Sequence, residues 1–251
     1  MNGLFGTYHI VAMVLSLTFI VGLYILSRRL QFKTLCKVLF FTGIVSEVVK
    51  IFAYIIMNEE KYGGVLPKTD LPFHLCSIQI IFFAIITYAN SEKLKRFIIS
   101  FMVPSCLFGG IAAILIATSS SLNVPVITVQ YFLYHVAITV FAINLLTRKE
   151  ISLSVKDYFN CLKFLGIIMF FAFYINSMLY DGESNINFMY VVSPPASGLP
   201  YLNEEKGWLV YIIRYAILII VAVTLCYIKP IVCAIKAKIK NKSENQEDNT
   251  K

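Results

Sequence analysis

The sequence predicts an all-α, polytopic membrane protein with seven transmembrane helices, an N-terminus outside and a cytoplasmic C-terminus. The first observation behind this prediction is composition, since 58% of the 251 residues are hydrophobic, 14% are charged and the mean hydropathy is +0.75. Soluble domains are only about 45–50% apolar, so a soluble fold would not bury this much apolar surface. The second observation is that the apolar residues form windows of about 20 residues, the length that crosses a membrane core of about 30 Å as a helix. A secreted disulfide scaffold, a disordered chain and a coiled coil are therefore excluded.

Seven windows satisfy the length criterion: residues 5–27, 35–57, 73–89, 97–117, 125–147, 157–180 and 207–228. The first is too long for a cleaved signal peptide and lacks a charged start and a cleavage site, so we expect a retained helix. The third window is short, so the alternative is a protein with six spans in which this window is re-entrant. An even number of spans would, however, put the basic C-terminal tail on the side of the membrane opposite to the other basic residues. We expect residues 1–230 to form the transmembrane domain and residues 231–251 to form a disordered, basic and polar tail in the cytoplasm.

The distribution of basic residues predicts the orientation of these spans. One side of the predicted membrane carries only Lys61, Lys68 and Lys206. The other side carries Arg28, Arg29, Lys33, Lys37, Lys93, Lys95, Arg96, Arg148, Lys149, Lys156, Lys229, Lys236, Lys238, Lys240, Lys242 and Lys251. By the positive-inside rule this second side is cytoplasmic.

The net charge of +8 is therefore a topology signal, and the segments between the windows are too short to form a nucleic-acid-binding domain. The positions of the six cysteines imply no disulfide framework. The abundance of Ile, Lys and Asn points to an AT-rich bacterial genome, so we expect the protein in a bacterial plasma membrane. No metal or cofactor is predicted.

Polar residues within the windows concentrate in the half that should face outside. Ionisable groups in a span are costly and usually face a cavity or a partner, so each is a candidate functional residue. The set is His9, Glu47, Lys50, His74, Cys76, Gln130, His135, Asn176 and Arg214. Glu47 and Lys50 share a helical face, where they form either a structural ion pair or a site in which Glu47 orients a histidine or carries a proton.

The segment from Asp70 to Gln79 is the densest polar cluster, and Pro72 suits the first turn of a helix. On that helix His74 and Cys76 are separated by about 200° and do not easily touch. A nucleophilic Cys76 would therefore need a base from another helix, and His135 is the best candidate. The alternative is that Cys76 is a small buried hydrophobe and that His74 and His135 are buried, hydrogen-bonded side chains.

Two further features favour a site on the outer side. Residues Thr128, Tyr131, His135 and Thr139 form a polar stripe at helical spacing, and Arg214 suits an oxyanion or, alternatively, an ion pair with Glu47. The loop from Asp181 to Lys206 contains the segment 185–198, which includes Asn187 and Pro194-Pro195 and is apolar but too short to span. We expect it to dip back or to lie at the interface, where it would cover the outer cavity.

Several motifs together carry a family resemblance: Gly6-Thr7-Tyr8-His9, Glu47-x-x-Lys50, Leu71-Pro72-Phe73-His74-Leu75-Cys76, His135, Asn187-Phe188-Met189-Tyr190 and Pro194-Pro195. In these motifs the chain resembles the bacterial YwaF-type integral membrane proteins and is similar, more distantly, to the eukaryotic transmembrane protein 164 family. The resemblance implies a helical membrane fold and, through the eukaryotic relatives, acyl transfer between phospholipids by a cysteine and a histidine.

Three classes of function follow from these residues. The first is a membrane acyltransferase or lipid hydrolase, with Cys76 as nucleophile, His135 or His74 as base and membrane phospholipid or lysophospholipid as substrate. Its substrate-binding residues would be Arg214, Lys50, Glu47, Gln130, Asn187 and His9. The second is a proton-coupled transporter or ligand-binding protein that needs no nucleophile, and the third is a scaffold with a polar packing core.

Overall fold

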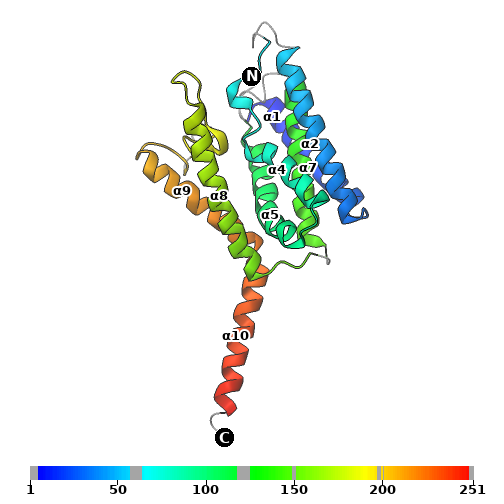
Figure 1. Ribbon diagram of the computed structural model, residues 1–251, viewed down its shortest axis with the longest axis vertical. Coiled ribbons are helices and arrows are strands. Elements are labelled where there is room, and N and C mark those ends of the chain that lie inside the picture. Colours follow the sequence, from blue (N-terminus) through cyan, green and yellow to red (C-terminus); the bar gives the residue numbers. More distant parts are fainter. Residues whose placement is uncertain are drawn as a thin grey trace.

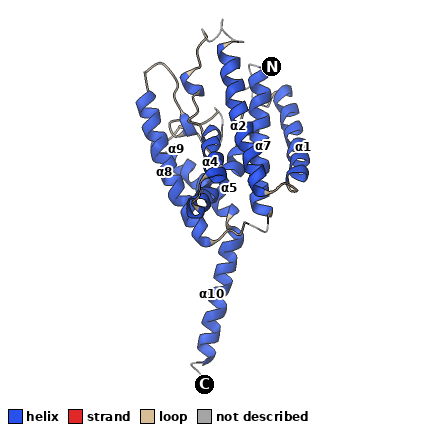
Figure 2. Ribbon diagram, turned by 45° about the vertical axis from the view of Figure 1, so that its right-hand side comes forward, coloured by secondary structure: helices blue, strands red, loops and turns tan. Residues whose placement is uncertain are grey.

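The computed structural model describes residues 5–56, 64–117, 125–148, 151–196, 199 and 201–248, and these residues are helical or in turns and loops (Figures 1 and 2). The α-helices are α1 (Thr7–Ser27), α2 (Phe32–Ile55), α4 (Leu75–Tyr88), α5 (Glu92–Leu115), α7 (Pro125–Thr147), α8 (Val155–Leu179), α9 (Trp208–Cys226) and α10 (Ile228–Asp248). Two short 3₁₀ turns, η1 (Lys68–Asp70) and η2 (Phe188–Tyr190), lie in the connections.

Seven helical segments in the described residues are long and apolar enough to cross a membrane, which confirms the predicted number of spans. The third runs from Lys68 to Tyr88 and combines η1 with α4. Helix α4 begins at Leu75, so the prediction that it begins at Pro72 is wrong. Pro72 instead lies in a turn, in which the Phe73 N–H donates to the Leu71 carbonyl at 2.7 Å.

Helix α7 lies at the centre of the molecule, because it packs against α1, α2 and α5. Figure 1 shows these helices and α4 side by side, with α8 and α9 next to them and α10 extending away. We call the end at which α1 begins the N-terminal end of the bundle, and the end from which α10 departs the C-terminal end. Phenylalanines fill the core: the rings of Phe83 and Phe141 lie 4.8 Å apart, and that of Phe164 packs on Phe82 and Phe101.

Close packing of α5 on α7 depends on Gly110. A Cβ at this position would lie 2.2 Å from Thr139 Oγ1 and 3.1 Å from the His135 carbonyl oxygen. A residue without a side chain at this position therefore lets the two helices approach closely.

Helix α10 covers most of the tail that the sequence predicts to be disordered. Apolar residues Ile228, Val232, Ile235 and Ile239 recur at spacings of three and four, which is the helical period. The domain boundary at residue 230 and the placement of both termini across a membrane stay predictions.

Candidate functional site

A cavity of about 370 Å³ lies at the N-terminal end of the bundle. Its walls come from α2, from the segment that leads into α4, from α7 and from the loop between α8 and α9. The lining residues are Glu47, Lys50, Tyr54, Thr69, Asp70, His74, Cys76, Ser77, Ile127, Gln130, Tyr131, Tyr134, His135, Asn185, Asn187, Tyr190, Ser193, Pro194 and Pro195. The structure therefore gathers seven of the predicted site residues in one place: Glu47, Lys50, His74, Cys76, Gln130, His135 and Asn187.

Glu47 and Lys50 form an ion pair in the cavity wall, with Lys50 Nζ 2.7 Å from Glu47 Oε2. The Ser77 hydroxyl donates to the other oxygen, Glu47 Oε1, at 2.6 Å. Both charged side chains are less than one-fifth exposed, so each needs the other. The alternative that Arg214 pairs with Glu47 is not seen, because Lys50 takes that place.

His135 presents a free ring nitrogen. Its Nδ1 lies 2.7 Å from the Tyr131 carbonyl oxygen. Because a carbonyl only accepts, Nδ1 carries the hydrogen and Nε2 keeps the lone pair in the neutral ring. This Nε2 has no hydrogen-bond partner among the described residues, as a general base requires.

His74 is the residue before the first turn of α4. Its Nε2 donates to the Thr69 carbonyl at 3.2 Å, and its ring packs against those of Phe188 and Tyr190. These contacts place His74 between α4 and the loop that carries Asn187.

Cys76 lies in the first turn of α4 and is half-buried. Its carbonyl oxygen accepts a hydrogen bond from the Tyr134 hydroxyl at 3.0 Å, which fixes this turn against α7. Within the described residues no hydrogen bond joins the Cys76 thiol to His74 or His135. The three side chains thus share one cavity, but they do not form a preassembled catalytic pair.

The loop between α8 and α9 forms one wall of the cavity, as expected for a segment that covers the site. Asn187 ties the loop to itself, since its Nδ2 donates to the Ser193 carbonyl and hydroxyl at 2.8 Å each. Ser197 and Gly198 of the predicted loop lie outside the described residues.

A second predicted polar residue, Asn176, connects α8 to this loop. Its Nδ2 donates to the Phe188 carbonyl at 3.0 Å, and its Oδ1 accepts from the Phe188 N–H at 2.7 Å.

Tyrosines of α9 hold the same loop at its sharpest turn. Met189 and Tyr190 have positive φ values of 57° and 53°, a conformation that non-glycine residues rarely adopt. The Tyr215 hydroxyl donates to the Met189 carbonyl at 2.9 Å, and the Tyr211 hydroxyl donates to the carbonyls of Tyr190 and Ser193. These bonds maintain the turn that places Tyr190 in the cavity wall.

An ion pair fixes the other end of this loop to η1. Lys68 Nζ lies 2.6 Å from Asp181 Oδ2, and the N–H groups of Ser184 and Glu183 donate to the same carboxylate. The pKa of Asp181 is held well below its ordinary value, mainly by the hydrogen bond from Lys68 and further by those from Ser184 and Glu183.

Besides Asn176, two of the predicted site residues, His9 and Arg214, lie outside the cavity lining. His9 is buried between α1 and α5, where its Nδ1 accepts from the Phe5 N–H at 3.0 Å and its Nε2 donates to the Ile114 carbonyl at 2.9 Å. Arg214 on α9 donates to the Tyr201 carbonyl and to Asn203 Oδ1. A substrate-binding role for either residue therefore has no support from the lining of the cavity.

An apolar groove of about 520 Å³ adjoins the polar cavity between α2 and α7. Its lining is Thr42, Val45, Ser46, Val49, Pro125, Val126, Val129, Gln130, Leu133 and Tyr134. Gln130 and Tyr134 line both spaces, and Gln130 Nε2 donates to the Ser46 hydroxyl between them. The sequence reasoning missed Tyr134, although its spacing of four from Gln130 places both on one face of α7.

Seven helices of membrane-spanning length in the described residues define a multi-pass membrane protein, and two of them, α2 and α7, contribute to its polar cavity together with the start of α4 and the loop between α8 and α9. The model of the TMEM164 family matches residues 4–227, nearly the whole chain, and the protein belongs to this family. Comparison with curated proteins and with solved structures found no match. Membership of the bacterial YwaF-type group stays a prediction.

Proposed function

We propose that the protein is a membrane-embedded lipid acyltransferase or lipid hydrolase whose active site is the cavity that contains Cys76 and His135. One observation carries the proposal: a cysteine and a histidine with a free Nε2 line a polar cavity that shares Gln130 and Tyr134 with an apolar groove. A phospholipid has the matching shape, with a polar ester region and a long apolar chain. The groove between α2 and α7 would hold the acyl chain, and the cavity would hold the ester and the phosphate.

The chemistry would proceed through a thioester. Cys76 Sγ attacks the acyl ester carbonyl while His135 Nε2 takes the thiol proton, the ester C–O bond breaks, and the departing oxygen receives that proton. The hydroxyl of a lysophospholipid, or a water molecule, then attacks the thioester and its proton returns to sulfur through the histidine. The acyl group leaves as a new ester or as a fatty acid.

Substrate binding must bring the thiol and the imidazole together, because no hydrogen bond joins them in the described part of the chain. Catalytic hydrogen bonds often tighten only when the substrate is bound. Lys50 is placed to contact the lipid phosphate, since its ammonium lies in the cavity wall and has donors beyond the one used by Glu47. By the predicted orientation, the reaction would take place in the outer leaflet of a bacterial plasma membrane.

Purified protein in nanodiscs, given a phospholipid with a labelled acyl chain and an unlabelled lysophospholipid, tests the proposal. We expect labelled acyl exchange, or labelled fatty acid for a hydrolase, which Cys76→Ala and His135→Ala abolish. Cys106→Ala is the matched control, because Cys106 is a free, buried cysteine of α5 that is not part of the cavity lining. Activity that is absent, or that Cys76→Ala leaves unchanged, would overturn the proposal.

A proton-coupled transporter or ligand-binding protein is the second candidate. The network of Ser77, Glu47 and Lys50 in the cavity wall favours it, because such a network suits proton transfer and needs no nucleophile. Vesicles that contain the protein and a pH-sensitive dye, placed under a pH gradient, test it. Proton flux above that of empty vesicles should persist in Cys76→Ala and be lost in Glu47→Gln; flux equal to that of empty vesicles counts against this function.

A further inference from the structure

A second cavity, of about 410 Å³, lies at the C-terminal end of the bundle, away from Cys76 and His135. It is enclosed by the start of α2, the end of α4, the start of α5 and the segment that leads into α8. Its lining is Phe32, Lys33, Ile86, Thr87, Glu92, Lys95, Arg96, Ile99, Ser100, Ile151, Ser152, Leu153 and Asp157. The proposed acyl transfer uses none of these residues.

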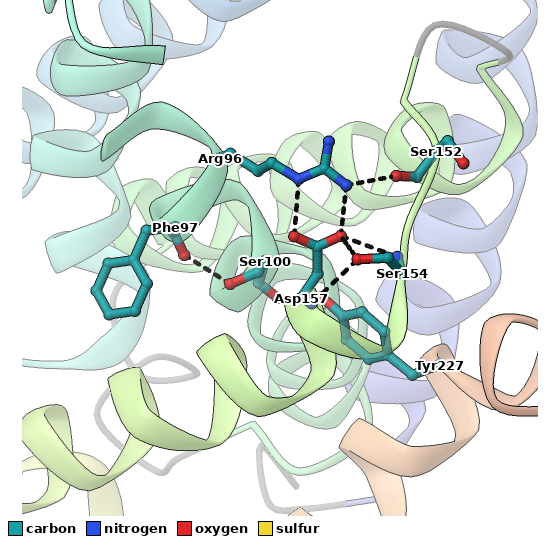
Figure 3. Close-up of polar contacts among 7 residues, drawn as sticks. All are labelled: Arg96, Phe97, Ser100, Ser152, Ser154, Asp157 and Tyr227. Atoms are coloured by element: carbon teal, nitrogen blue, oxygen red, sulfur yellow. Dashed lines mark hydrogen bonds and ion pairs between the residues drawn. The ribbon is translucent and has the colours of Figure 1, made fainter. Parts of the chain in front are cut away.

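The charges of this cavity are arranged around a fixed guanidinium. Arg96 donates to both oxygens of Asp157, from Nε at 2.9 Å and from Nη2 at 2.7 Å, and Nη2 also donates to the Ser152 carbonyl (Figure 3). Asp157 is buried and also accepts from the Ser154 hydroxyl and N–H, so four hydrogen bonds hold this carboxylate. This arrangement holds Arg96 in place and leaves its Nη1 without an acceptor among the described residues.

Positive charge exceeds negative charge in the lining. Lys95 pairs with Glu92 at 2.8 Å, and Arg96 pairs with Asp157, whereas Lys33 has no hydrogen bond or ion pair in the described part of the chain. Three cations therefore face two carboxylates. The unbalanced charge is what an anionic ligand requires.

A buried hydroxyl in the same wall also lacks a partner. Thr87 is only 4% exposed, and its Oγ1 makes no hydrogen bond among the described residues. Buried polar groups are nearly always hydrogen-bonded, so an orphaned hydroxyl on a residue that lines a cavity indicates a ligand or water that supplies the missing bond. Thr87 belongs to α4 and Lys33 to α2, so the two signals arise independently.

We propose that this second cavity binds a phosphate group. Lys33, Arg96 Nη1 and the Thr87 hydroxyl would donate to its oxygens, in keeping with the preference of cationic donors for oxyanions. The remaining wall is apolar, from Phe32, Ile86, Ile99, Ile151 and Leu153, and this fits the glycerol and first carbons of a phospholipid. The phosphate belongs either to such a headgroup or to a free phosphate ion.

Binding of three probes to the full-length protein in detergent micelles tests the proposal. The probes are inorganic phosphate, a short-chain phosphatidic acid and the diacylglycerol with the same chains, which lacks the phosphate. We expect phosphate or phosphatidic acid to bind and diacylglycerol not to bind. Saturation by inorganic phosphate assigns the site to a free ion, whereas binding of phosphatidic acid alone assigns it to a headgroup.

Variants attribute the binding to this cavity. Lys33→Gln and Thr87→Val should each raise the Kd about tenfold, because each removes one donor to a charged oxygen. Lys37→Gln is the matched control, since this exposed lysine lies one turn further along α2 and is not part of the lining. If circular dichroism shows folded variants and neither substitution changes the Kd of any probe, or if Lys37→Gln changes it equally, the proposal is overturned.

Discussion

The Ser77 hydroxyl on α4 donates to Glu47 Oε1 on α2 across 2.6 Å, directly beside Cys76. This bond ties the first turn of α4 to the helix that carries Lys50. The position of the proposed nucleophile thus depends on a contact between two spans. Its loss should affect both the stability of the fold and the geometry of the site.

Ser77→Ala should destabilise the protein by about 1–3 kcal/mol, because a half-buried carboxylate loses a hydrogen bond. The midpoint of unfolding in detergent measures the effect. Thr42→Ala is the matched control, since the Thr42 hydroxyl donates only to its own helix, at the Val38 carbonyl. Equal midpoints for Ser77→Ala and the wild type would show that the bond contributes nothing to the packing of α4 on α2.

Gly110→Ala should cost about 1–3 kcal/mol through overpacking, because the new methyl group would meet Thr139 Oγ1 at 2.2 Å. The double variant Gly110→Ala/Thr139→Ala removes that oxygen and should recover part of the loss. Gly166→Ala on α8 is the control, with no atom within 4 Å of its Cβ, and should be neutral or stabilising by up to about 1 kcal/mol. A Gly110→Ala variant as stable as Gly166→Ala contradicts the close packing of α5 on α7.

Asp157→Ala should lower the free energy of unfolding by about 2–4 kcal/mol. The buried carboxylate caps the start of α8, where it accepts from Ser154, and it also holds Arg96, so the substitution removes a cap and an ion pair together. Glu92→Gln breaks an exposed pair with Lys95 and should stay within about 1 kcal/mol of the wild type. If Asp157→Ala and Glu92→Gln lowered the free energy of unfolding by similar amounts, the greater burial of Asp157 would not contribute to stability.

The pairing of Asp181 with Lys68 should make stability depend on pH. Because the pKa of Asp181 is lowered in the folded protein, its contribution is present above the unfolded value of about 3.9 and is lost as the pH falls through the folded pKa. The difference in melting temperature between the wild type and Asp181→Asn should therefore be largest above pH 5 and shrink toward pH 2. A difference that is constant with pH would exclude this linkage.

Filling the apolar groove should change chain-length selectivity if the proposed function is correct. Val129 lines the groove and is exposed, so Val129→Trp should reduce exchange from long-chain donors at least tenfold and spare short-chain donors. Ile217→Trp places the same bulk on an exposed position of α9 as a control. If Val129→Trp reduced exchange equally for long-chain and short-chain donors, the groove would not be the site that binds the acyl chain.

Hydropathy alone predicted the seven spans, because length and apolar content are local properties of the chain. The depth of polar residues along the spans placed Glu47, His74 and Cys76 at one level, and they do share a cavity. Depth says nothing about lateral position, however. His9 and Arg214 lie at a similar level on α1 and α9, outside the cavity lining.

Other features depended on tertiary contacts that the sequence does not display. Helix α4 begins at Leu75 rather than at Pro72, where the chain turns before the helix starts. Tyr134 resembles one more apolar residue of α7 in the sequence, and its hydroxyl bond to the Cys76 carbonyl places it beside Cys76. The cavity with Lys33 and Thr87 joins four segments that no motif connects.

Gln130 and Tyr134 stand where the polar cavity meets the groove between α2 and α7. Under the proposed function, a lipid that enters through this groove would stay in the plane of the bilayer, and its product would depart by the same lateral route. Turnover would then follow the mole fraction of lipid among its neighbours rather than its concentration in bulk. Dilution of the membrane with inert lipid, at constant total substrate, would therefore lower the rate of turnover, as an inhibitor does.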